Sequence, residues 1–238
     1  MILKETSPLL RLPNGLPAAL VQLLDGVRYG IEMADLSYQR LAGTMLSLFA
    51  PESERPPSHV LATSAFLDAW SMINSVSRLR KLIPQAYDAR VPAQKVFLDE
   101  TEALRQLRNS IEHADERILR AEPFPMPGTP PLWGILECLA PGPSRRTARC
   151  ASLTPGTRTF RWASSAVVDC PYPKSPVDHI SITAFDVELS LTKMHEVVER
   201  LARGLEEVSP PIEPTFSFSD LLMVFETPYD APEGDKSG

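Results

Sequence analysis

The sequence predicts a mainly α, α+β protein: an antiparallel four-helix bundle with a small antiparallel β insertion between the third and fourth helices. Three observations carry this prediction. Apolar residues recur at helical spacing over most of residues 17–120 and again over 191–208. Residues 121–186 lose that spacing and hold 11 of the 24 prolines in the chain. Short runs rich in β-branched and aromatic residues stand in this stretch instead, and such runs favour strands.

Apolar stripes and end signals define the four helices. They are expected over residues 17–49, 58–83, 93–120 and 191–208. Pro17 suits a first helical turn, and Pro51 ends the first helix. Ser58 is the expected cap of the second helix and Pro84 its end, while Ser190 caps the fourth. Each stripe is too long to remain in water, so the helices are expected to pack on one another.

The β insertion spans residues 121–186 and contains five candidate strands. These are WGILECL (133–139), TARCASL (147–153), TRTFRWA (157–163), SAVVD (165–169) and HISITAF (179–185). The turn signal Thr154-Pro155-Gly156-Thr157 lies between the second and third runs. These two runs are therefore expected to form a hairpin.

The chain divides into a body and a tail that differ in charge. Residues 1–208 read as a single domain, and residues 209–238 as an acidic, proline-containing tail with six acidic residues and one basic residue. The net charge is −6, and most of it lies in that tail. A nearly neutral body argues against tight binding of long nucleic acid, because such binding needs many phosphate contacts. The tail also holds the apolar run FSFSDLLMVF (216–225), which is expected to cover a groove on this bundle or on a second subunit.

The cysteines and the chain start indicate a cytoplasmic protein without a membrane segment. Cys138, Cys150 and Cys170 are odd in number and widely spaced, which does not make a disulfide framework. Together with His179 they suggest a zinc site, but their spacings match no zinc knuckle, so buried structural cysteines are the preferred interpretation. No cofactor is expected. The first residues do not form a signal peptide, and no run of apolar residues is long enough for a membrane helix.

One string in the third helix carries chemistry. Arg108, Asn109 and His113 form an R-N-x-x-x-H pattern, and the chain contains only three asparagines and four histidines. Asn109 and His113 are four residues apart, so the amide can orient the imidazole across one helical turn. The long side chain of Arg108 can reach the same cleft, and Arg105 shares the face of Asn109.

The second helix offers polar partners for that cleft. Asp68, Ser71, Ser75 and Arg78 form a polar stripe beside the apolar one. An acid in this stripe can hold the histidine or the arginine. We therefore take Arg105, Asp68 and Arg78 as candidate binding residues. The competing interpretation is a solvated helix face, because Arg108 and Glu112 are also an ordinary pair four residues apart.

The string resembles the motif of the HEPN superfamily, helical proteins whose arginine, following polar residue and histidine form a nucleotide-binding or ribonuclease site. The flanking segment EHADERI (112–118) also resembles a group of uncharacterised bacterial proteins with an R-N…E-H-x-D-E-R core. The resemblance covers residues 58–120 and extends to the fourth helix. It implies that Arg108, Asn109 and His113 are the functional positions, and that a second copy across a homodimer completes the site.

Two functions follow from the resemblance and the composition. The first is a HEPN-like protein that binds RNA or a nucleotide and acts as a metal-independent endoribonuclease in a dimer. The alternative is a non-enzymatic helical dimerisation or nucleotide-sensing module of a bacterial stress or defence system. Neither interpretation involves DNA or a membrane.

Overall fold

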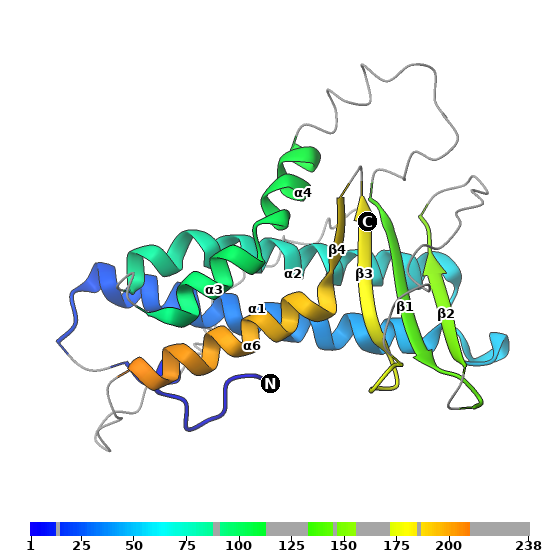
Figure 1. Cartoon of the computed structure of the whole chain (residues 1–238), viewed down its shortest axis with the longest axis horizontal. Coiled ribbons are helices and arrows are strands. Elements are labelled where there is room, and N and C mark those ends of the chain that lie inside the picture. Colours follow the sequence, from blue (N-terminus) through cyan, green and yellow to red (C-terminus); the bar gives the residue numbers. More distant parts are fainter. Residues whose placement is uncertain are drawn as a thin grey trace, which may run out of the picture.

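Two long antiparallel helices and a four-stranded sheet form most of the described chain (Figure 1). This computed structural model describes residues 1–12, 15–87, 91–112, 133–144, 147–155, 172–184 and 187–209, and for residues 110–112 the backbone alone. The α-helices in those ranges are α1 (Ala18–Ser47), α2 (Ser58–Ala86), α3 (Pro92–Glu100), α4 (Ala103–Glu112) and α6 (Leu191–Val208). The strands are β1 (Ile135–Pro141), β2 (Ala148–Leu153), β3 (Asp178–Ala184) and β4 (Val187–Ser190). The mainly helical α+β class is confirmed.

Helices α1 and α2 pack closely because glycine stands at their contact. A Cβ atom at Gly30 would lie 2.7 Å from Cδ2 of Leu79, and one at Gly26 would lie 2.9 Å from Cδ1 of Leu82. Leu79 is fully buried, so a side chain at position 30 would have to displace it within the packed core. Further along the same antiparallel register, the hydroxyl of Ser37 donates to Ser71 Oγ at 3.0 Å. The two predicted helices are thus joined along their length.

Helix α2 runs past the proline that was expected to end it. Pro84 lies inside the helix, which ends at Ala86 with Tyr87 N donating to the carbonyl of Ile83. Proline has no N–H, so the carbonyl of Arg80 receives no bond from residue 84. The helix ends within one turn of this lost bond, so the proline acts as a late stop.

The expected third helix is divided, which corrects the prediction of one helix over 93–120. In an uninterrupted helix the carbonyl of Leu98 accepts from residue 102. Here Arg80 of α2 donates to that carbonyl, while Glu102 N turns to the carbonyl of Asp99 at 3.4 Å. Helix α3 therefore ends at Glu100 and α4 leaves in another direction (Figure 1). The four-helix bundle is not confirmed by the described residues, and 113–120 lie outside them.

The sheet is antiparallel and has the strand order β2-β1-β3-β4. Strand β1 is buried along nearly its whole length and pairs Leu139 with Cys150 of β2 and Leu136 with Ile182 of β3. Three of the five predicted runs are confirmed as strands. The runs at 157–163 and 165–169 lie outside the described residues, and so does the expected hairpin between residues 153 and 157.

Strand β4 leads directly into α6. Its last residue, Ser190, caps α6 by accepting from Lys193 N at 3.2 Å, as predicted. Helix α6 contacts α1, α3 and β3, and the strands run across the two long helices (Figure 1). This arrangement brings the first turns of α6 beside the middle of α1.

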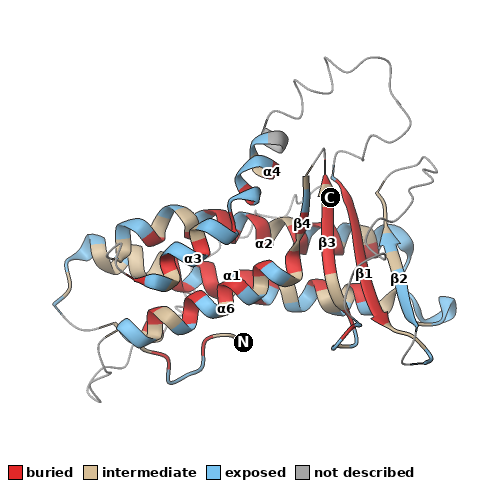
Figure 2. Cartoon of the chain, viewed as in Figure 1, coloured by how far each residue is buried: buried red, intermediate tan, exposed pale blue. Residues whose placement is uncertain are grey.

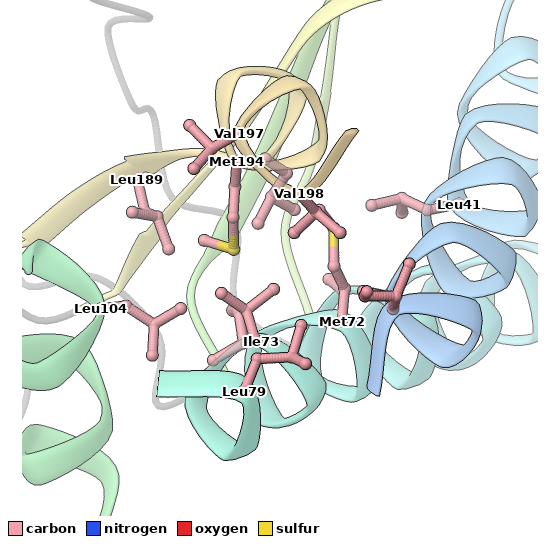
Figure 3. Close-up of a cluster of buried hydrophobic side chains, with 14 of the residues drawn as sticks. Leu41, Met72, Ile73, Leu79, Leu104, Leu189, Met194, Val197 and Val198 are labelled. Carbon is pink, nitrogen blue, oxygen red and sulfur yellow. The ribbon is translucent and has the colours of Figure 1, made fainter. Parts of the chain in front are cut away.

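Buried residues lie on the facing sides of the helices and along β1 and β3 (Figure 2). Figure 3 shows the centre of this core, in which Leu41 of α1, Met72 of α2, Leu104 of α4, Leu189 of β4 and Met194 of α6 converge. The same core includes Leu136, Cys138, Ile180 and Ile182 from one face of the sheet. No helix within the described ranges is long and apolar enough to cross a bilayer.

Candidate functional site

A polar pocket lies between α2 and α4. It encloses about 270 Å³. Its lining comprises Ser77, Arg80, Lys81, Leu104, Arg105, Arg108 and Asn109. Four of these seven side chains carry a positive charge. A concave surface with this charge attracts anions.

Both helices supply their polar residues at the same spacing. The two triplets are Ser77, Arg80 and Lys81 on α2, and Arg105, Arg108 and Asn109 on α4. Residues three and four apart share one face of a helix. Leu104 and Leu107 are fully buried and anchor α4 on the core. The polar face of α4 therefore stands beside that of α2.

Arg108 joins the two helices. Its Nη1 donates to the hydroxyl oxygen of Ser77 at 2.9 Å. Ser77 is only 6% exposed, so this acceptor has a fixed position, and Arg108 itself is half-buried. The bond holds the guanidinium group of Arg108 at the pocket before any ligand arrives, which reduces the entropy lost on binding.

The other cations differ in how firmly they are held. Arg80 donates to the carbonyl of Leu98, to Thr101 Oγ1 and to Glu102 Oε2, and its side chain is 16% exposed. Arg105 lies 3.9 Å from Glu102, and both side chains are mostly exposed. Arg80 therefore stabilises the break between α3 and α4, whereas Arg105 lies at the rim with a weak, solvated partner.

The structure brings together part of the sequence-predicted site. Arg105, Arg108 and Asn109 line one pocket, as their spacing indicated. His113 follows directly after the last residue of α4 and lies outside the described residues. The predicted contact between Asn109 and His113 remains a prediction.

The predicted polar stripe on α2 does not join the pocket. Asp68 is buried and forms an ion pair with Arg40 of α1, with 3.2 Å between Arg40 Nε and Asp68 Oδ1. Ser71 accepts from Ser37 of α1. Asp68 and Ser71 therefore face α1 rather than α4. Arg78 is exposed and does not line the pocket.

The α2 side of the pocket was missed by sequence reasoning. Ser77, Arg80 and Lys81 are polar residues three and four apart, a pattern that also describes any solvated helix face. The distinguishing signal was the burial of Ser77 and Arg80, which depends on α4 and on the end of α3.

The cysteines form no metal site among the described residues. Cys138 is buried and Cys150 is exposed, which corrects the interpretation of Cys150 as a buried structural cysteine. Burial, followed by the nearby Cys150, raises the pKa of the Cys138 thiol to about 12. Within the described ranges, no three histidine, cysteine or acidic side chains lie close enough together to hold a metal ion. Cys170 lies outside those ranges.

Comparison with known proteins found no match to this chain. No protein-family model, no curated protein and no solved structure matches the chain.

Proposed function

We propose that the pocket between α2 and α4 binds the phosphate of a nucleotide or of RNA, and that the chain is a HEPN-like nucleotide- or RNA-binding protein. The observation that carries the proposal is the convergence of Arg108 with Arg80, Lys81 and Arg105 around one cavity of about 270 Å³. Asn109, at the same cavity, supplies an amide that donates and accepts hydrogen bonds.

The geometry suits a small phosphate-bearing ligand. Guanidinium groups make charge-assisted, bidentate hydrogen bonds to phosphate oxygens. The hydroxyl of Ser77 fixes the orientation of Arg108. A long duplex needs a broad basic surface, and the nearly neutral body of this chain lacks the corresponding charge. The proposed ligand is therefore a nucleotide or a short single-stranded RNA rather than DNA.

The catalytic form of the proposal adds His113. An imidazole near its ordinary pKa of about 6.5 can activate the ribose 2′-hydroxyl or protonate the leaving 5′-oxygen. Arg108 stabilises the charge that develops on the phosphorus oxygens. The products are a 2′,3′-cyclic phosphate and a 5′-hydroxyl, formed without a divalent metal. In this form, four helices build a HEPN-like domain, and a second copy completes the site in a homodimer.

The alternative is a sensing or dimerisation module without catalysis. The bond from Arg108 to Ser77 supports this form, because it holds the guanidinium at the pocket, and binding alone requires no general base. The cytoplasm of a bacterium, in a stress or defence system, is the proposed setting for either form.

Binding is tested with fluorescent mononucleotides and short RNA. We expect Arg108→Ala to weaken binding at least about tenfold, because a charge-assisted hydrogen bond contributes about 1.5–3 kcal/mol. Arg203→Ala is the matched control, since Arg203 is an exposed arginine on α6. Equal affinity in wild type, Arg108→Ala and Arg203→Ala would contradict the proposal.

Catalysis is tested by incubating the protein with RNA in EDTA. Cleavage that disappears in His113→Ala supports the endoribonuclease, whereas binding without cleavage supports the sensing module. Equal cleavage by wild type and His113→Ala rules out His113 as the catalytic group. Circular dichroism of each variant confirms that the helices remain.

A further inference from the structure

A second polar centre lies where α6 crosses α1, on elements that do not line the pocket between α2 and α4. Asp35, in the middle of α1, is 2% exposed. Its carboxylate lies 2.7 Å from Ile2 N, 2.9 Å from Gln39 Nε2 and 2.8 Å from His195 Nε2 of α6. The pair of Asp35 and His195 joins residues 160 positions apart in the chain.

The partners of Asp35 define the tautomer of His195. Burial raises the pKa of Asp35, but hydrogen bonds from His195, Ile2 and Gln39 together bring it below its usual range. The carboxylate is therefore ionised at neutral pH and can only accept hydrogen bonds. His195 Nε2 must then carry a proton, and in the neutral ring the lone pair lies on Nδ1.

The imidazole ring is held on a second side. Tyr38 stacks on His195, with 4.2 Å between ring centroids and 17° between ring planes. The hydroxyl of Tyr38 donates to Thr192 Oγ1 at 3.1 Å, and Thr192 Oγ1 also accepts from Ile180 N at 2.9 Å. An oriented imidazole backed by a carboxylate is the arrangement of a general base.

The His195 side chain lines a groove. His195 lines a cavity of about 510 Å³ between α1, the segment before β3 and the start of α6. Its side chain is 14% exposed, and Nδ1 makes no hydrogen bond to any residue that the structure describes. The volume lies in the range of small-molecule sites.

The charges around the groove select the ligand. Asp178 and Glu196 line it, and with Glu199 they add to burial in raising the pKa of Tyr38, against the opposing bond to Thr192. This negative potential repels phosphate and carboxylate ligands. Ala42, Leu46 and Val177 supply an apolar wall, and Lys174 supplies a cation among the described lining residues.

We infer that Asp35 and His195 form a general-base centre that hydrolyses small, uncharged carboxylic esters. His195 Nδ1 takes a proton from water, and the water oxygen bonds to the ester carbonyl carbon. The carbonyl π electrons move to its oxygen, where Lys174 stabilises the negative charge. When the tetrahedral intermediate collapses, the bond to the alkoxy oxygen breaks and that oxygen takes the proton from Nδ1. A carboxylic acid and an alcohol leave, and the imidazole is neutral again.

The test uses the full chain with 4-nitrophenyl acetate. We expect turnover faster than that of the same concentration of free imidazole, and a fall in kcat/KM of about 100-fold in His195→Gln. His59→Gln is the matched control, because His59 is an exposed histidine on α2 outside this groove. Turnover no faster than imidazole, or equal turnover in wild type and His195→Gln, would overturn the inference.

Two further measurements separate catalysis from folding. In ¹⁵N–¹H spectra of the folded protein, the neutral ring of His195 should carry its proton on Nε2, and a proton on Nδ1 would overturn the inference. Asp35 is a positioning residue. In Asp35→Asn kcat should fall while KM stays near its wild-type value, since the imidazole is then no longer held by a carboxylate, whereas an unchanged kcat argues against this role.

Discussion

Two buried carboxylates on the neighbouring helices α1 and α2 have pKa values shifted in opposite directions. Asp35 is 2% exposed and Asp68 is 4% exposed. Asp35 accepts three hydrogen bonds, from Ile2, Gln39 and His195. Asp68 has one charged partner, Arg40, whose side chain is 57% exposed.

The difference in partners changes the sign of the pKa shift. Burial raises the pKa of Asp68, and the attraction and hydrogen bond of Arg40 offset this only in part. Burial acts on Asp35 in the same direction, but its hydrogen bonds outweigh it and the pKa falls. A buried carboxylate is thus favourable only where several fixed donors replace its lost hydration.

The largest expected effect comes from removing Asp35, the carboxylate with three hydrogen bonds. Asp35→Ala leaves the N–H groups of Ile2, Gln39 and His195 without their acceptor. We expect the free energy of unfolding to fall by about 3 kcal/mol, because each buried donor left unpaired costs about 1–3 kcal/mol. Urea unfolding measures it. A loss under about 1 kcal/mol would mean that the three bonds contribute little.

Removing Arg40 tests how much its ion pair stabilises the buried carboxylate of Asp68. Arg40→Ala leaves Asp68 buried and charged, so we expect a loss of about 1–2 kcal/mol in urea unfolding. The double variant Arg40→Ala, Asp68→Asn should recover most of this loss, because the unpaired charge is gone. If the double variant is as unstable as Arg40→Ala, the arginine stabilises by packing instead.

The pH dependence of stability should separate the two groups. The lowered pKa of Asp35 contributes stability that is present above its unfolded pKa of about 3.9 and is lost as pH falls through the folded pKa. The raised pKa of Asp68 does the opposite, since its contribution is lost as pH rises from the unfolded to the folded pKa. Between about pH 3 and pH 7, Asp35 should lower the wild-type urea midpoint as the pH falls, whereas Asp68 should raise it. Asp35→Asn should therefore remove the decrease, and Asp68→Asn should remove the increase. The same curve in both variants would refute the comparison.

The smallest expected effect is that of Asp68→Asn alone. Replacing a buried charge that has one exposed partner removes its desolvation cost along with the ion pair, so these changes nearly cancel. We expect the free energy of unfolding at neutral pH to change by less than about 1 kcal/mol, towards greater stability. A clear loss of stability would show that the ion pair with Arg40 outweighs the burial of Asp68.

The helices show where sequence reasoning succeeds and fails. The bounds of α1 and the cap of α6 at Ser190 follow from local spacing and end signals, which tertiary contacts do not override. The break after Glu100 depends on Arg80, a residue 18 positions before the carbonyl of Leu98. The segment between α3 and α4 has no glycine or proline that marks this break.

The candidate sites show the same contrast between residues that are near in sequence and residues that only packing brings together. Arg105, Arg108 and Asn109 are near in sequence, so their shared helix face was visible from spacing alone. Ser77 and Arg80 belong to the same pocket only because α4 packs beside α2. His195 pairs with buried Asp35, 160 positions away, and no spacing in the sequence indicates that pairing.

The sequence by itself determined the helical periods, the β runs and the cluster of polar residues on α4, because each depends on residues within a few positions of one another. Only the tertiary structure decided which charges are paired. Asp35 and His195 meet because β4 leads directly into α6 and places its first turns beside the middle of α1. Pairing at that distance depends on the packing of apolar faces, and apolar spacing indicates that a face is buried without specifying what covers it.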